Sequence, residues 1–158
     1  MNHNNISSSI LMFFLFFLLS NTVCSSTEMV EGEKVGSLRN VVGEGYVQRA
    51  GESEQIKAVD GLEVFQNDTI STKNDTSLGL VFKDSTRISL GANSKLTITK
   101  YVFNPSKKKF SMLTRLSKGS LSYVSGKLSK LAPNSVSFET PDATIGSRGT
   151  SFIIKVDE

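Results

Sequence analysis

Apolar and polar residues alternate along most of the chain, in short runs separated by turn-forming residues. The clearest runs of this kind are Tyr46-Val47, 78–82, 88–90, 96–98, 121–123, 136–138 and 152–154. In a β-strand successive side chains face opposite sides, so this period of two buries one face and leaves the other in water. Thr, Val, Ile, Phe and Tyr, which pack well on a pleated sheet, dominate the runs. The pattern therefore predicts many short strands.

Residues that favour tight turns lie between these runs. They are Asn67-Asp68, 73–75, 83–85, 91–93, 104–106 and Pro133-Asn134. Asn, Asp and Gly tolerate the left-handed backbone of tight turns, and Pro presets the turn angle. Strands at such even spacing predict an all-β fold, either a compact β-sandwich or a short β-solenoid. The one helical signal, over Leu113–Ser117, predicts no more than a single turn.

The N-terminus has the layout of a secretory signal. A polar stretch, 1–9, precedes an apolar run, 10–19, and small polar residues follow over 20–27. The apolar run is shorter than the roughly 20 residues of a membrane-spanning helix. We therefore predict a signal peptide over 1–26, a linker over 27–41, a β domain over 42–158, and a periplasmic or secreted location.

Two alternatives for this segment stay open. The residues before the apolar run include no Lys or Arg, so an uncleaved N-terminal anchor is the first. The second is lipid anchoring at Cys24. A lipoprotein signal normally has a small residue before the cysteine and an aliphatic residue three positions before it, whereas this chain has Val23 and Asn21. The sequence favours cleavage, and contact with a membrane only through this signal segment.

Charge and composition narrow the classes of partner. The chain has 18 Lys and Arg against 15 Asp and Glu, a formal net charge of +3 that is spread along its length. Nucleic-acid-binding proteins usually concentrate positive charge on one face, so we predict no nucleic-acid partner. The densest positive run, Lys107–Lys109, fits a solvated hairpin tip that discourages aggregation at sheet edges. Attraction to an anionic surface or to nucleic acid is the alternative.

The sequence offers few residues for catalysis. His3 is the only histidine and Cys24 the only cysteine, and both lie in or beside the predicted signal peptide. This excludes histidine-based triads and Cys/His zinc sites in the exported domain. Carboxylates remain, with a cluster at Glu52, Glu54, Asp60 and Glu63 that could serve a glycan hydrolase. Turn aspartates usually bond their own backbone instead. We predict no catalytic residue, no metal site, no cofactor and no enzymatic activity.

The segment Thr140–Phe152 resembles the closing signature of the FecR domain, which reads Thr-Pro, an Ala-rich apolar link and then Arg-Gly-Thr-x-Phe. Other segments resemble further parts of that domain in the same order. They are Asp60-Gly61, 68–72, 80–90, 94–98, 118–121 and 124–127. This chain differs from the family pattern at Ser85, where the family hairpin usually has Gly, and at Ser147, where Val or Ile usually precedes the Arg. We expect Ser85 to favour a different local turn.

The resemblance, which spans about 42–156, implies an extracytoplasmic β-domain that acts through protein contact. In its best-known setting the domain relays iron-uptake signals to a sigma factor. This chain has neither the sigma-binding region nor the spanning helix, so we expect a free-standing exported version. The resemblance also singles out signature residues, which are Thr140, Pro141, Gly146, Arg148, Gly149, Thr150 and Phe152.

The chemistry of the signature favours a structural role. Pro141 removes a backbone donor and biases Thr140 toward an extended backbone. Gly146 and Gly149 allow backbone angles that other residues resist. Arg148 presents a planar fork of donors that can pin a corner between two strands, or can contact a partner.

We therefore predict a non-enzymatic binding module whose partner is an envelope protein or a glycan, acting in envelope signalling through a sheet face or an edge strand. A structural subunit of a secreted or cell-surface assembly is the second hypothesis. A carboxylate-based glycan hydrolase is the third.

Overall fold

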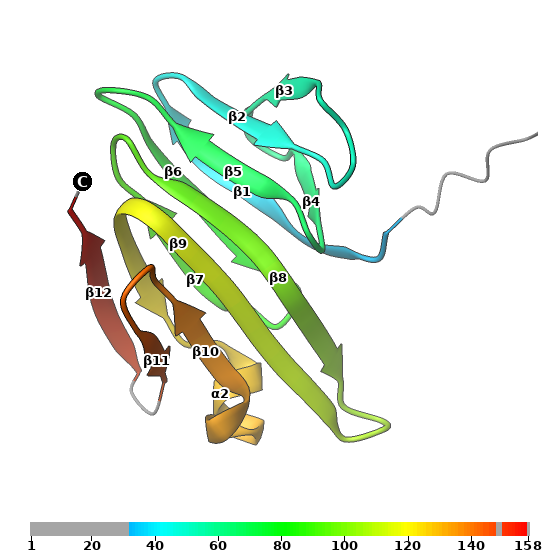
Figure 1. Cartoon of the computed structure of the whole chain (residues 1–158). Coiled ribbons are helices and arrows are strands. Elements are labelled where there is room, and N and C mark those ends of the chain that lie inside the picture. Colours follow the sequence, from blue (N-terminus) through cyan, green and yellow to red (C-terminus); the bar gives the residue numbers. More distant parts are fainter. Residues whose placement is uncertain (1–31, 148–149, 158) are drawn as a thin grey trace, which may run out of the picture. The chain divides into compact units, whose positions relative to one another are not determined.

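The computed structural model describes residues 32–147 and 150–157, which form a curled sheet of short strands (Figure 1). The all-β prediction is confirmed. The predicted signal peptide, 1–26, lies outside the described residues. The strands are β1 (Lys34–Val42), β2 (Gly45–Gln48), β3 (Gln55–Lys57), β4 (Glu63–Phe65), β5 (Thr69–Thr72), β6 (Ser77–Phe82), β7 (Arg87–Leu90), β8 (Lys95–Asn104), β9 (Lys109–Val124), β10 (Val136–Glu139), β11 (Thr144–Gly146) and β12 (Ser151–Val156). Two short helical segments, α2 (Lys127–Leu131) and η1 (Pro133–Ser135), join β9 to β10.

The sheet consists of two halves that share the long strand β9. We call β4-β1-β6-β7-β9-β12 the β7 half and β3-β2-β5-β8-β9-β10-β11 the β8 half. The first part of β9 pairs with β8, and its last part pairs with β7 and β12. Neighbouring strands are antiparallel, except that β10 runs parallel to β9.

The buried faces of the two halves pack against each other. The ring of Phe82 in β6 stacks on that of Tyr101 in β8, with centroids 5.0 Å apart. Tyr123, in the last part of β9, meets Phe138 of β10 at the same centroid distance. One continuous core of buried residues joins both halves. Of the two predicted architectures, this arrangement is the sandwich.

Gly119 marks the point where β9 passes from one half to the other. Its φ is +86°, a left-handed backbone that other residues resist. A Cβ atom at this position would lie 2.5 Å from the Cα of Ser94, so the backbone of the turn just before β8 leaves no room for a side chain. The bend that closes the sandwich therefore depends on this glycine.

Four of the turns end with the same arrangement of two residues. In each, a non-glycine residue with positive φ is followed directly by a buried polar residue. The pairs are Asn67/Asp68, Asp75/Thr76, Ser85/Thr86 and Asn93/Ser94. At Ser85, where a different local turn is expected, φ is 68°, a left-handed conformation that glycine adopts readily. Ser85 N–H donates to the carbonyl of Phe82 and closes a tight turn.

The structure differs from the sequence analysis at two places. Leu113–Ser117 lies inside β9 and is strand, since cross-strand pairing with β8 and β10 outweighs its local helical tendency. β1 begins at Lys34, so most of the expected linker over 27–41 is strand. Val35 and Leu38 of β1 are both buried although they are three positions apart, because a bulge shifts the register between Lys34 and Gly36. The apolar residues of β1 therefore do not alternate with a period of two.

Candidate functional site

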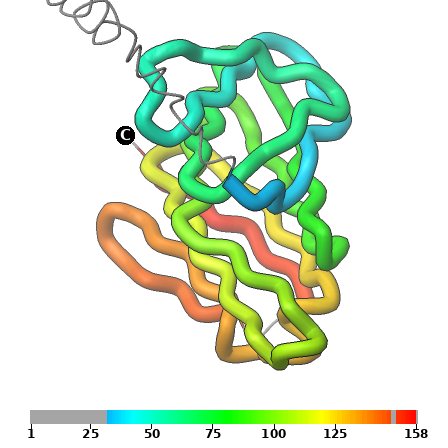
Figure 2. The backbone as a smooth tube through the Cα atoms, turned by 90° about the vertical axis from the view of Figure 1, so that its right-hand side faces the viewer, coloured from blue at the N-terminus to red at the C-terminus, as the bar shows by residue number. Residues whose placement is uncertain are grey.

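The signature residues divide between the surface and the core. Thr140 and Pro141 lie in the exposed connection between β10 and β11, the orange hairpin at the side of the molecule in Figure 2. The connection is a tight turn, because Thr140 N–H donates to the carbonyl of Ala143 at 2.8 Å and Thr140 Oγ1 accepts from Ala143 N–H at 3.1 Å. Thr140 therefore fixes the shape of this hairpin tip.

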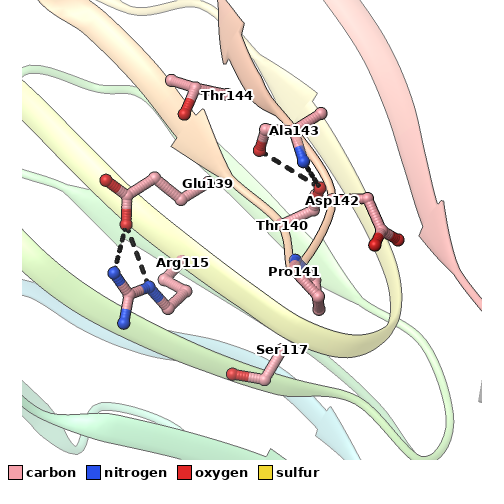
Figure 3. A pocket seen from close by; sticks show the side chains of 8 residues that line it. All are labelled: Arg115, Ser117, Glu139, Thr140, Pro141, Asp142, Ala143 and Thr144. Atoms are coloured by element: carbon pink, nitrogen blue, oxygen red, sulfur yellow. Dashed lines mark hydrogen bonds and ion pairs between the residues drawn. The ribbon is translucent and has the colours of Figure 1, made fainter.

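An open hollow lies beside this hairpin and is shown in Figure 3. Its volume is about 540 Å³, and β9, β10 and the hairpin contribute its lining residues. Within it, Nε and Nη2 of Arg115 donate to Oε2 of Glu139 at 2.9 and 2.7 Å. The parallel pairing of β9 and β10 places these two residues side by side. The hollow thus presents a fixed guanidinium–carboxylate pair among hydroxyl groups.

Sequence reasoning missed both members of this pair. Arg115 and Glu139 are 24 residues apart and carry no local motif, and only the parallel register joins them. The position of Glu139 directly before the Thr140-Pro141 signature was the one available signal.

Of the other described signature residues, Phe152 and Thr150 make contacts within the fold, whereas Gly146 leaves open space where a side chain would lie. Phe152 packs its ring against Tyr123 and Phe138, at centroid distances of 4.9 and 5.2 Å. The carbonyl of Thr150 accepts from the N–H of Ser125 at 2.8 Å, which anchors the start of β12. Gly146 does not have a positive φ, and a Cβ there would meet no atom within 4 Å, so its backbone does not require glycine.

Arg148 and Gly149 lie outside the described residues. The strands on either side of them, β11 and β12, belong to the β8 half and the β7 half, respectively. The chain therefore changes halves between β11 and β12.

Strand β12 forms an edge of the β7 half and pairs only with β9 among the described strands. The hydrogen bond from Ser125 N–H to the carbonyl of Thr150 shows which residues of β12 turn their backbone groups toward β9 and which turn them away. Hydrogen bonds in an antiparallel ladder involve every second residue, so the N–H groups of Ser151, Ile153 and Lys155 face the open edge. The Ile153 side chain is 76% exposed.

A buried polar cluster lies under the β6–β7 turn. Asp84, fully buried, accepts hydrogen bonds through its carboxylate from Tyr101 Oη, Thr86 Oγ1 and the N–H of Leu128. Its carbonyl accepts the N–H of Lys127 at 2.8 Å. Burial, followed by the nearby Asp84 carboxylate, raises the pKa of Tyr101 above its usual range. Asp84 thus ties the turn to the start of α2.

A second buried carboxylate, Asp68, serves the β4–β5 turn. It accepts from Phe65 N–H at 2.8 Å and from the guanidinium of Arg49, which stacks on the Phe65 ring. Burial raises the pKa of Asp68, and this effect outweighs the Phe65 N–H and the Arg49 charge, which lower it.

The family model described as FecR protein matches residues 68–158, more than half of the chain. This protein belongs to the FecR family. A search of the curated proteins finds no match to the chain, and neither does a search of the solved structures. The matched residues begin at the buried carboxylate of Asp68 and cover β5–β12. Strands β1–β4 precede the match but complete the FecR sandwich, because β1 pairs with β6 and β2 with β5.

The strand segments that resemble the FecR family bury alternate residues. In the segment 68–72, Asp68, Ile70 and Thr72 are buried, and the Thr72 hydroxyl donates to the carbonyl of Gly91 and accepts from Ser94 N–H. In 124–127, Gly126 packs so tightly that a Cβ would lie 2.3 Å from the backbone nitrogen of Thr86. These FecR motifs therefore maintain the fold.

The remaining candidate groups are also engaged or exposed. Asp60, from the acidic cluster, accepts from the N–H groups of Asn40 and Val41, and Glu63 pairs with Lys34 at 2.5 Å. The run 107–109 lies at the exposed tip of the β8–β9 hairpin, as expected. Over 32–147 and 150–157, no group of three or more His, Cys, Asp or Glu could hold a metal ion. In the same ranges no helix is long and apolar enough to cross a membrane.

Proposed function

We propose that this FecR-family protein is a non-enzymatic, extracytoplasmic module in envelope signalling, which binds an envelope protein by adding a strand of the partner to β12. The observation that carries the proposal is the open edge of β12. Strand addition at a sheet edge is a common way for β-domains to bind extended segments, because main-chain groups supply the affinity. The exposed Ile153 adds an apolar side chain next to those groups.

The location is part of the proposal. We infer a periplasmic or secreted protein that contacts the membrane only through its N-terminal signal segment. The apolar run over 10–19, and the membership of the FecR family, support this location.

The hollow supports the non-enzymatic part of the proposal. A glycosidase needs two carboxyl groups that face one sugar, roughly 5–10 Å apart. The carboxylates of the hollow belong to Glu139 and Asp142. Glu139 is held by Arg115, and the side chain of Asp142 points to the opposite side of the hairpin in Figure 3. We expect no turnover when the purified chain is incubated with a panel of polysaccharides.

Site-specific photo-crosslinking in cells that produce the full chain tests the binding edge. A photoreactive amino acid at Lys155, on the outer side of the edge strand, should yield an adduct with one envelope protein. The same amino acid at Ser89, on the outer face of the interior strand β7, serves as the matched control and should not.

The substitution Ile153→Pro removes an outward N–H without removing a bond to β9, so it should abolish the Lys155 adduct while the protein stays folded. An adduct that is equally strong from Ser89, or that survives Ile153→Pro, would contradict the proposal. An adduct of two copies of the chain would instead favour a structural subunit of a surface assembly, which can use the same edge.

A further inference from the structure

A row of polar side chains crosses the outer face of the β8 half, one from each of six neighbouring strands. The pairing of these strands gives the order Gln48, Thr69, Thr97, Arg115, Glu139 and Thr144. Each of the six is exposed or half-buried, whereas the residues next to them in sequence on β5, β8 and β9 are buried. The row therefore faces solvent. At a strand spacing of about 4.8 Å, it is about 24 Å long.

The groups along this row can both donate and accept hydrogen bonds. The hydroxyls of Thr69 and Thr97 lie 3.0 Å apart and share one bond, which leaves each with unused bonding capacity. Both bonds of the Arg115–Glu139 pair end on Oε2, so Nη1 of Arg115 and Oε1 of Glu139 have no partner among the described residues. The row thus offers hydroxyls, one donor nitrogen, one acceptor oxygen and the amide of Gln48, of which Nε2 already donates to the carbonyl of Glu52 at 3.0 Å.

The row has no net charge, because the carboxylate of Glu139 balances the guanidinium of Arg115. A nucleic acid or an anionic polymer would require excess positive charge. A peptide strand would add at an edge, since the backbone groups in the middle of the sheet are already paired. An uncharged chain that carries many hydroxyls fits both the neutrality and the mixture of donors and acceptors.

One end of the row opens into the hollow beside Pro141. Its volume of about 540 Å³ lies within the range of small-ligand sites, and Pro141 adds an apolar surface among the polar groups of Ser117, Thr144 and the ion pair. Figure 3 shows Arg115 and Glu139 on one side of this hollow and the hairpin on the other. The hollow therefore offers depth at the end of an otherwise flat face.

We propose that the outer face of the β8 half binds an extended, uncharged polysaccharide, with one sugar unit in the hollow beside Pro141 and the chain continuing over Thr97 and Thr69. This site is on a different half of the sandwich from the β12 edge, so the two proposals stand or fall separately.

Calorimetric titration of the full chain with neutral hexasaccharides tests the site, using cellohexaose, maltohexaose and laminarihexaose, with disaccharides of the same linkages for comparison. We expect at least one hexasaccharide to bind, and to bind more tightly than its disaccharide because it spans more of the row. Thr97→Val keeps the shape and suits a strand, so the protein should fold while its affinity falls about five- to tenfold, the effect of one lost hydrogen bond. Ser89→Ala, on the outer face of the β7 half, is the matched control and should leave the affinity unchanged.

Three results would overturn the proposal. They are no binding of any neutral hexasaccharide, equal affinity for the wild-type protein and Thr97→Val, and binding only of charged polysaccharides that is lost as salt is added. Ile153→Pro distinguishes this site from the proposed protein contact, because it should abolish the crosslink at the β12 edge and leave the hexasaccharide affinity unchanged.

Discussion

The hydroxyl of Tyr101 donates to Oδ1 of Asp84 at 3.0 Å and accepts the backbone N–H of the same Asp84 at 3.1 Å. One side chain from the β8 half thereby satisfies both the backbone and the carboxylate of a buried turn in the β7 half. Asp84 of this turn also accepts hydrogen bonds from the backbone N–H groups of Lys127 and Leu128, the first residues of α2. This exchange couples three parts of the chain that are distant in sequence.

Tyr101→Phe should therefore destabilise the fold by about 1–3 kcal/mol, because the buried Asp84 N–H loses its partner. Chemical denaturation measures the change. Tyr46→Phe is the matched control, since the Tyr46 hydroxyl bonds Glu44 at the surface. It should change stability by less than about 0.5 kcal/mol. Equal losses of stability for the two substitutions would show that the buried Tyr101–Asp84 hydrogen bonds contribute no more than a surface hydrogen bond.

Gly119→Ala should be among the most damaging single substitutions in the chain. Gly61 has almost the same backbone angle, with φ of +85° against +86°, but a Cβ added there would meet no atom within 4 Å. Gly61→Ala thus measures the backbone penalty alone, about 1–2 kcal/mol. Gly119→Ala adds the clash with Ser94 and should cost about 1–3 kcal/mol more. Similar losses for both would mean that the bend of β9 can relax around a methyl group.

Ser85→Gly should stabilise the protein by about 1 kcal/mol, since Ser85 has a left-handed backbone that glycine adopts without strain. Thermal denaturation should show a rise of several degrees in Tm. Ser89→Gly, in the middle of β7, is the control and should lower stability by about 0.5–1 kcal/mol. A fall in Tm for Ser85→Gly would indicate that the serine side chain contributes more than its backbone strain costs.

Asp68 should make stability depend on pH in an unusual direction for a carboxylate. Because burial raises its pKa in the folded state, the folded protein keeps this proton to a higher pH than the unfolded chain. Its contribution is complete below the unfolded value, about 4, and is lost as the pH rises through the folded pKa. As the pH rises from about 4 through the folded pKa of Asp68, the free energy of unfolding of the wild type should therefore fall relative to that of Asp68→Asn.

Denaturation of both proteins at a series of pH values measures that difference. Thr97→Val changes no titratable group, so its difference from the wild type should be independent of pH. A wild-type stability that rises relative to Asp68→Asn would mean that the ion pair with Arg49 outweighs burial.

The alternation of apolar residues predicted the central strands, because each of them buries one face and leaves the other in water. It could not reveal β3, β4 and β11, which have three residues each, too few to show a period. It also could not reveal the bulged β1, or the pairing of β10 with β9. These features depend on contacts between distant segments, and local sequence carries no record of register.

The candidate site was predictable only in part. The Thr140-Pro141 signature marked the hairpin beside the hollow, since both residues belong to a recognisable motif. The row that ends in Arg115 and Glu139 has no motif, because one residue comes from each strand. The signature residue Phe152 packs against the core at its edge, so the family resemblance here pointed to a packing contact as well as to the hairpin beside the hollow.

The central place of β9 has a consequence for how the chain acquires its structure. Strands β7, β8, β10 and β12 each pair with β9, so each lacks one neighbouring strand until residues 109–124 have been made. The sets β4-β1-β6-β7 and β3-β2-β5-β8 share no strand pairing with each other except through β9. The two layers should therefore become one connected sheet only after residues 109–124 have been made, late in synthesis.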